Sequence, residues 1–124
     1  MALRTLHSEK AVAMVEQKVD SALAQAERDA EAIAELRRAI YLAPYQHEAH
    51  LVLGGVYLRD GRLDEAIDEL KISIWSQDTL AAHLTLAEAF IAAHNTEGAR
   101  SELQAALTRD PANSRAKQLL TELP

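Results

Sequence analysis

The fold of this chain is predicted most clearly by residues 47–78, which read HEAHLVLGGVYLRDGRLDEAIDELKISIWSQD. Four residues of this stretch have similar counterparts at one common offset of 33 positions. The matched pairs are Leu53 and Leu86, Gly54 and Ala87, Tyr57 and Phe90, and Ala66 and Ala99. One offset that holds for four pairs is much harder to obtain by chance than any single motif, so it indicates an internal repeat.

Each copy of the repeat is predicted to contain two helices. In the first copy, a helix from His47 to about Arg59 ends at Asp60-Gly61, because glycine adopts the left-handed conformation that closes a helix. Asp64 and Glu65 then place negative charge in the first turn of the next helix, where it complements the helix dipole. That second helix is expected to direct Ala66, Ile67, Leu70 and Ile74 inward, with Trp75 as a further candidate.

The second copy follows the same plan. Its first helix is capped by Asp78 or Thr79 and runs to about Ala93, and its second helix runs from Asn95 or Thr96 to about Arg109. Asp110-Pro111 then ends the copy, and Asn113 or Ser114 starts a last helix that continues through Leu123. The predicted boundaries are residues 47–79 and 80–113 for the two repeats and 114–123 for a capping helix.

The N-terminal third is less regular. Residues 1–7 are expected to be a flexible end, and residues 8–124 a single domain. Apolar residues at helical spacing predict a first helix that starts near Ser8, and a second helix ends at Pro44, whose ring is incompatible with helix continuation. With a turn at Glu27–Asp29, these two helices would form a degenerate repeat over about residues 13–46.

The sequence also allows a different arrangement of this part. No Gly or Pro marks a turn at Glu27–Asp29, and the apolar stripe passes through Ala26 and Ala30 without a change of phase. A single helix from about Ser8 to Leu42 is therefore the alternative. Such a helix would leave its stripe to be covered by a second chain.

Together these residues resemble the tetratricopeptide repeat family. The resemblance is good over residues 47–113 and partial over 13–46, where Asp20 replaces the small residue of the later copies. It implies an all-α fold of stacked antiparallel helix hairpins, because each hairpin buries only one face by itself and must stack on its neighbours to complete a core. The positions that carry the resemblance are Leu53, Gly54, Tyr57, Ala66, Leu70, Leu86, Ala87, Phe90, Ala99, Leu103 and Pro111.

Composition excludes several classes of protein. The formal net charge is −6 over 124 residues, with no cluster of Lys and Arg of the kind that binds nucleic acid. The chain has no cysteine, so thiolate metal sites and cysteine nucleophiles are excluded. The first ten residues lack the pattern of a signal peptide, and no apolar window is long enough to span a membrane. We expect a cytoplasmic protein.

Metal binding and catalysis are not expected either. His47 and His50 have helical spacing, but His50 and His83 lie 33 residues apart and therefore occupy matched positions, where the resembled family packs a large side chain between hairpins. We interpret both as packed side chains rather than ligands, and we predict no metal and no cofactor. No nucleophile triad, phosphate-binding loop or HExxH motif occurs, so the chain is not expected to be an enzyme.

The resemblance implies that function lies in a groove lined by the first helix of each repeat. Such a groove would suit an apolar, extended or helical peptide segment of a protein partner. The alternative interpretation is that the aliphatic side chains of this set pack on the next hairpin. The predicted groove residues are Leu51, Gly55, Leu58, Arg59, Leu84, Glu88, Ile91 and Ala92.

Two further expectations concern partners. One subset of the family holds the terminal carboxylate of chaperone tails with Lys, Asn and Arg. Here Leu51, Gly55, Leu84 and Glu88 stand at those places, so a chaperone tail is not expected. The second expectation is self-association as an alternative function, in which two chains cover the same groove or pair their N-terminal helices to form a homodimer.

Overall fold

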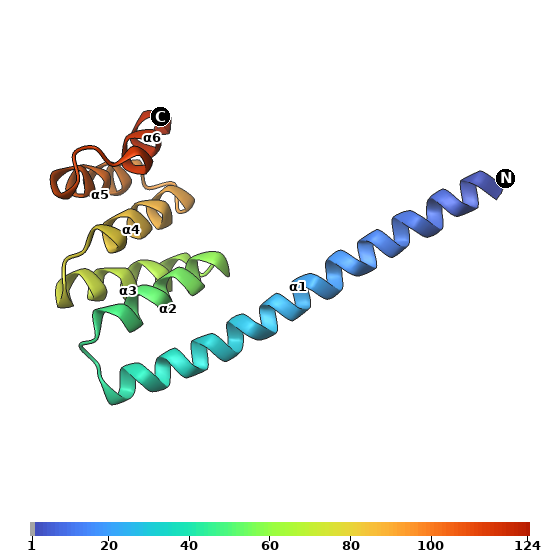
Figure 1. Ribbon diagram of the computed structural model, residues 1–124, viewed down its shortest axis with the longest axis horizontal. Helices are drawn as coiled ribbons and strands as arrows, with labels where there is room; N and C mark the ends of the chain where they lie inside the picture. The colour runs from blue at the N-terminus through green and yellow to red at the C-terminus, as the bar shows by residue number, and fades with distance from the viewer. Residues whose placement is uncertain (1) are drawn as a thin grey trace. The chain divides into compact units, whose positions relative to one another are not determined.

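The computed structural model describes residues 2–124, and it describes side chains from residue 9 onward. Met1, the first residue of the segment expected to be flexible, lies outside the described residues. Within the described part, every regular element is a helix (Figure 1). The helices are α1 (Ala2–Leu42), α2 (His47–Arg59), α3 (Leu63–Ser76), α4 (Leu80–Ala92), α5 (Thr96–Arg109) and α6 (Ser114–Glu122).

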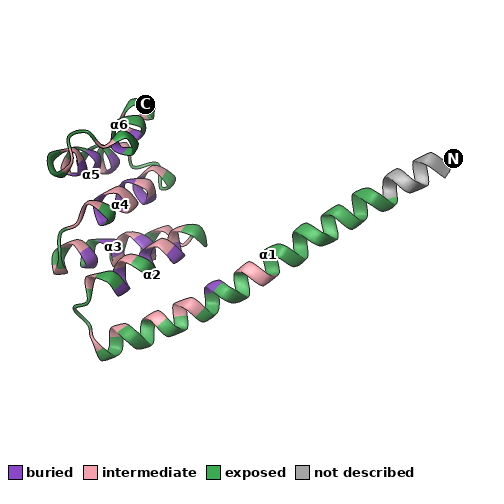
Figure 2. Ribbon diagram, in the orientation of Figure 1, coloured by how far each residue is buried: buried purple, intermediate pink, exposed green. Residues whose placement is uncertain are grey.

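Internal packing divides the chain into two units, residues 1–31 and residues 32–124. The first unit consists of the N-terminal part of α1. Its apolar residues at helical spacing, Val12, Val15, Val19 and Leu23, are between 51% and 60% exposed. Figure 2 shows this stretch as mostly exposed, whereas every helix from α2 to α6 carries buried residues.

The predicted turn at Glu27–Asp29 is wrong, because α1 continues through these residues without a break. Residues 13–46 therefore contain no helical hairpin, and the single-helix alternative describes this part of the chain. The helix also begins before Ser8, at Ala2. A physical reason lies at Asp20, since a carboxylate stands there in place of the glycine or alanine that allows the two helices of a hairpin to approach each other.

The second unit is built from two hairpins that stack in chain order. Helix α2 packs on α3, α3 on α4, α4 on α5, and α5 on α6. The turn between α2 and α3 has the predicted left-handed glycine, Gly61, with a φ of +79°. In the turn between α4 and α5, His94 takes the equivalent place with a φ of +59°. The two copies thus use one type of turn, although only the first has a glycine.

Side-chain caps begin the later helices. Thr79 accepts a hydrogen bond from the Ala82 amide at the start of α4, and Asn95 accepts one from Gly98 at the start of α5. Asn113 does the same for the Ala116 amide at the start of α6, at 2.8 Å. These caps pair backbone donors that have no partner within the helix.

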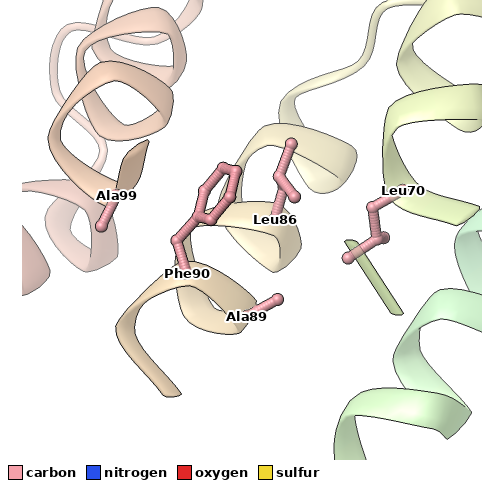
Figure 3. Close-up of a cluster of buried hydrophobic side chains, with 5 residues drawn as sticks. All are labelled: Leu70, Leu86, Ala89, Phe90 and Ala99. Carbon is pink, nitrogen blue, oxygen red and sulfur yellow. The ribbon is translucent and has the colours of Figure 1, made fainter. Parts of the chain in front are cut away.

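The core of the second unit follows the repeat. Leu70 on α3 packs with Leu86, Phe90 and Ala99, so this cluster joins one hairpin to the next (Figure 3). Ala87 and Leu103 form a second cluster with α6, and Leu53, Tyr57 and Ala66 form a third within the first hairpin. Of the residues that carry the family resemblance, all are buried except Pro111, which lies in the exposed loop before α6.

The end of α1 that belongs to the second unit packs on the first hairpin. Ile33, Leu36 and Ile40 contact the cluster of Leu53, Tyr57 and Ala66. The second unit therefore begins with the C-terminal part of α1, ahead of the two hairpins.

Candidate functional site

The aliphatic residues predicted to line the groove are only half-exposed. Leu51 and Leu58 on α2 pack against the cluster that joins the two hairpins. Leu84 on α4 packs against the cluster shared with α6, and Ile91 touches both clusters. These four side chains therefore contribute to the stacking of the hairpins, as the alternative interpretation expects, and each leaves part of its surface open.

A more exposed row lies beside them on α2. Glu48, Val52 and Arg59 are exposed, and Gly55 is half-buried between them at helical spacing. A Cβ built on Gly55 would meet no atom within 4 Å, so the surface is open there. Val52 is 52% exposed, yet it was not among the predicted groove residues. Its helical spacing of three from Gly55 and four from Glu48 was the signal that could have identified it.

The corresponding face of α4 is partly occupied by α6. Glu88, which is half-buried, forms an ion pair with Arg115 of α6, with 3.6 Å between Oε1 and Nε. Leu120 and Leu123 pack against the same cluster as Leu84. Ala92, at the end of α4, is exposed. The predicted residues of α4 thus lie next to the capping helix, and the carboxylate of Glu88 has a basic neighbour that the sequence analysis did not foresee.

Three hollows in the described part of the chain lie elsewhere. The largest of them, about 410 Å³, is lined by Ile91, the turn after α4 and residues 123–124. A second, about 220 Å³, lies along residues 45–48. The third, about 250 Å³, is a shallow apolar site beside Val12 and Val15 on α1. Ile91 is the one predicted groove residue that lines any of the three.

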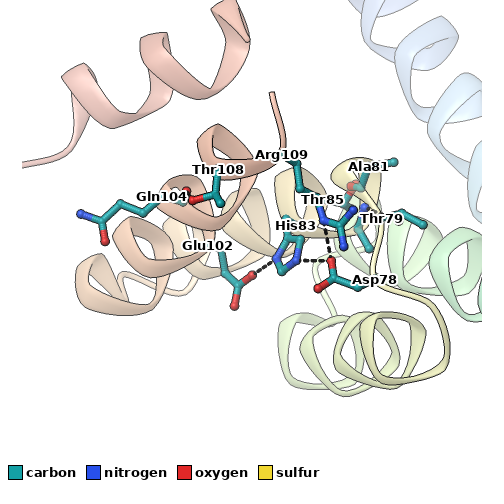
Figure 4. A network of polar contacts seen from close by, with 10 residues as sticks. Asp78, Thr79, Ala81, His83, Thr85, Glu102, Gln104, Thr108 and Arg109 are labelled. Carbon is teal, nitrogen blue, oxygen red and sulfur yellow. Dashed lines mark hydrogen bonds and ion pairs between the residues drawn. The ribbon is translucent and has the colours of Figure 1, made fainter. Parts of the chain in front are cut away.

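The two matched histidines connect the helices of each hairpin. His50 lies between Glu69 Oε2, 2.6 Å from Nδ1, and the Pro44 carbonyl oxygen, 2.7 Å from Nε2. His83 lies between Glu102 Oε2 and Asp78 Oδ1, each 2.6 Å from a ring nitrogen (Figure 4). Both imidazoles are buried, which agrees with their interpretation as packed side chains. Their glutamate partners were missed, although each lies 19 residues after its histidine.

Asp78 also contacts a second basic group. Arg109 Nε donates to Asp78 Oδ1 at 2.9 Å. This guanidinium, and then the hydrogen bond to His83, lower the pKa of the Asp78 carboxyl. The loop before α4 is thereby held to the end of α5.

A second polar network surrounds the buried ring of Tyr57. Arg37 of α1 donates to the Tyr57 hydroxyl, at 2.5 Å from Nη2 and 3.0 Å from Nε. The Arg62 guanidinium lies 4.6 Å from the ring centroid and pairs with Glu65 at 2.5 Å. That hydrogen bond lowers the pKa of Glu65 and raises the pKa of Arg62. This network fixes residues 32–42 of α1 on the first hairpin.

Several aromatic residues are exposed. Trp75 was a candidate for the inward face of α3, but its side chain is 75% exposed, so that expectation is wrong. Its ring lies 6.0 Å from the ring of Tyr45, which is 72% exposed. Tyr41, at the end of α1, is 84% exposed. The packing of α3 between α2 and α4 leaves Trp75 on an outer surface.

Among the side chains from residue 9 onward, no three His, Asp or Glu residues come together in a way that could hold a metal ion. Of the helices from residue 2 onward, none combines the length and apolarity that a membrane span requires.

Comparison with known proteins shows what the repeat is similar to. Residues 75–123 match the family model described as tetratricopeptide repeat. A similar solved structure is the first such domain of Spaghetti (RPAP3) bound to the HSP90 peptide SRMEEVD. It is 18% identical, with a TM-score of 0.75 and coverage of 77% of each chain. No match to a curated protein sequence was found. Residues 75–123 are thus similar to the tetratricopeptide repeat family, and the chain shares the all-helical hairpin fold of the matched domain.

Proposed function

We propose that this chain is a non-enzymatic scaffold that binds a protein or peptide partner along the exposed face of α2 and α4. The observation that carries the proposal is the row of Glu48, Val52, Gly55 and Arg59, which is open to solvent at its centre because Gly55 has no neighbour within 4 Å of a Cβ position. A partner backbone can approach a glycine more closely than any other residue. The similar domain of RPAP3 was solved with a bound peptide, which supports a peptide partner for this fold.

The expected partner segment is apolar. Val52 offers an exposed aliphatic surface, and Leu51, Leu58 and Leu84 extend it with the parts that packing leaves open. An extended or helical segment with apolar side chains would bury this surface on binding. The half-buried aliphatic residues thus have two roles in this proposal, since the same side chains align the hairpins and contact the partner.

An acidic chaperone tail fits this face poorly. Glu88 faces Arg115 at 3.6 Å, so that basic group is already paired. No lysine or arginine stands at Leu51, Gly55 or Leu84, where cations would be needed for a terminal carboxylate. We expect the peptide SRMEEVD to show no binding by fluorescence polarisation at concentrations up to about 1 mM.

The proposal can be tested with Gly55→Leu. Peptides selected from a random display library on the wild-type chain would be labelled, and their affinities for the variants measured by fluorescence polarisation. Gly55→Leu fills the open centre of the row without a core clash and is expected to weaken binding about tenfold or more. Asp68→Leu, on the exposed side of α3, is the matched control and should bind like the wild type. Equal binding by both variants would refute the assignment of this face.

Self-association is a second candidate function, favoured by the apolar stripe on α1. Val12, Val15, Val19 and Leu23 are each at least 51% exposed, which is unusual for four aliphatic residues on one stretch of helix. Val12, Val19 and Ala26 recur every seven residues, the spacing with which two helices pair. A second copy of the same helix would cover this stripe.

Light scattering on the purified chain tests this candidate. If α1 pairs with a second copy, Val15→Glu should convert a dimer to a monomer, whereas Gln17→Glu on the same stretch should leave the mass unchanged. A dimer that resists Val15→Glu but dissociates with Thr85→Glu would place the interface on α4. A strict monomer at all concentrations would eliminate self-association.

A further inference from the structure

The aromatic rings of Tyr45 and Trp75 lie together at one end of the first hairpin. Their centroids are 6.0 Å apart, and the ring planes are tilted by 51° to each other. Both side chains are largely exposed, although each offers a large apolar surface. Two aromatic side chains that meet in solvent rather than in the core form a contact surface for another molecule.

Hydrogen bonds hold the backbone of this region in place. The Ser76 hydroxyl donates to the Tyr45 carbonyl oxygen, and the buried Ser73 hydroxyl donates to the His47 carbonyl oxygen at 2.9 Å. These two bonds fix the loop between α1 and α2 against the end of α3 (Figure 1). Tyr45 is therefore positioned beside Trp75 before any ligand arrives, which lowers the entropic cost of binding.

A carboxylate lies next to the aromatic pair. Tyr45 and Glu48 both line the hollow of about 220 Å³ along residues 45–48. The Glu48 side chain is exposed, and its Oε1 lies 4.0 Å from His47 Nε2, which is too long for a hydrogen bond. The carboxylate can therefore accept hydrogen bonds from a ligand. An aromatic residue and a negative charge thus border the same hollow.

This combination favours a positively charged ligand. The face of an aromatic ring attracts a cation, and an indole ring does so most strongly. Other aromatic rings of this chain already make such contacts, because the Arg62 guanidinium lies 4.6 Å from the Tyr57 centroid and Lys71 Nζ lies 5.9 Å from that of Phe90. The formal net charge of −6 also attracts basic partners at long range.

We propose that Tyr45, Trp75 and Glu48 form a binding site for an arginine side chain of a protein partner. A planar guanidinium stacks on an aromatic face and donates paired hydrogen bonds to a carboxylate, whereas a lysine ammonium is a compact and strongly hydrated charge. Glu48 is also the first residue of the row on α2, so the arginine would lie beyond one end of an apolar segment bound there. That placement rests on the proposed function, whereas the arginine site itself requires neither Val52 nor Gly55.

The site can be tested by NMR titration of the isotopically labelled full chain with N-acetyl-arginine amide at constant ionic strength. Trp75 is the one tryptophan of the chain, so its indole N–H gives a single resonance. N-acetyl-citrulline amide has nearly the same shape without the charge and is the matched ligand control. We expect the arginine derivative to shift the Trp75 indole and Glu48 amide resonances with about threefold higher affinity than the citrulline derivative.

Variants separate the contributions of the ring and the carboxylate. Trp75→Ala removes an exposed side chain and should abolish the shift of the Glu48 amide. Glu48→Gln should weaken binding of the arginine derivative about twofold to threefold. Glu97→Gln, which removes an exposed carboxylate from the first turn of α5, is the matched control and should bind like the wild type. Gly55→Leu should also bind like the wild type, so failure of this site is distinguishable from failure of the row on α2.

Three results would overturn the proposal. Equal affinity for the arginine and citrulline derivatives would show that charge is not recognised. Unchanged binding by Trp75→Ala would show that the ring takes no part, and shifts as large at Glu97 as at Glu48 would show only general attraction to acidic residues. Equal affinity for N-acetyl-lysine amide would refute the choice of a guanidinium.

Discussion

Gly54 provides a direct test of how the first hairpin packs. A Cβ at Gly54 would lie 2.6 Å from Leu70 Cγ and 2.8 Å from Leu70 Cδ2, closer than real contacts of this kind. A Cβ at the next residue, Gly55, would meet nothing within 4 Å. Both glycines lie inside α2, so replacing either one by alanine gives the same gain in helix propensity. They form a matched pair that differs in the space available.

The magnitudes follow from this difference. Gly55→Ala is expected to stabilise the chain by about 0.5–1 kcal/mol, because alanine favours the helix and clashes with nothing. Gly54→Ala has the same gain but must displace the fully buried Leu70 side chain, and overpacking costs about 1–3 kcal/mol. Gly54→Leu adds further carbon atoms in the same place, so its cost should reach the upper end of that range, about 3 kcal/mol.

Urea unfolding at 25 °C, followed by far-UV circular dichroism, measures these differences as shifts of the midpoint at constant slope. The expected order of stability is Gly55→Ala, wild type, Gly54→Ala and Gly54→Leu. Two results would contradict the reasoning. An unchanged midpoint for Gly54→Leu would show that the helices do not approach there, and equal stabilisation by both alanine variants would show that Leu70 moves without cost.

Three further substitutions have definite expected outcomes. Asn113→Ala removes the cap of α6 and should lower the free energy of unfolding by about 1 kcal/mol in urea titrations. Gly61→Ala forces alanine to a φ of +79° and should cost about 1 kcal/mol in the same assay. In a plot of the free energy of unfolding against pH, Asp78→Asn should make the decrease at acidic pH, the acid limb, smaller than in the wild type. Arg109 and then His83 lower the Asp78 pKa, so its contribution is present above the ordinary carboxyl value and is lost as pH falls through the lowered value. An unchanged acid limb would contradict this last expectation.

The two hairpins could be predicted from sequence because the information that specifies them is local. Helix α2 has the predicted bounds of His47 and Arg59, and α5 ends at Arg109 as expected. Gly61 marked the turn between α2 and α3 directly. The equivalent turn at His94 has no glycine, but Asn95, one of the two predicted start residues, caps the next helix. A capping side chain thus marked the second turn where a glycine marked the first.

The sequence could not show in the same way whether the N-terminal third forms one helix or a hairpin. A continuous apolar stripe is compatible with one straight helix or with a hairpin, and no residue near Glu27–Asp29 has a conformational preference strong enough to choose. Asp20 was visible as a departure from the repeat. Its consequence for close packing became clear only from the Gly54 and Leu70 contact in the next copy.

The candidate site, too, could be predicted from the sequence only in part. Helical spacing brought the predicted residues of α2 and α4 to neighbouring faces, but it could not show that Leu51 and Leu84 share their surface with adjacent hairpins. Nor could spacing along one helix reveal the ion pair between Glu88 and Arg115. The histidine–glutamate pairs were accessible in principle, because a separation of 19 residues occurs twice at matched positions.

The outward orientation of Trp75 has a consequence for spectroscopy. It is the one tryptophan of the chain, and its indole ring is already surrounded mostly by water and by the ring of Tyr45. Its emission wavelength should therefore change little when the core unfolds. Trp75 fluorescence would respond instead to movement of Tyr45 in the loop between α1 and α2, which makes it an intrinsic reporter of that loop rather than of the folded state.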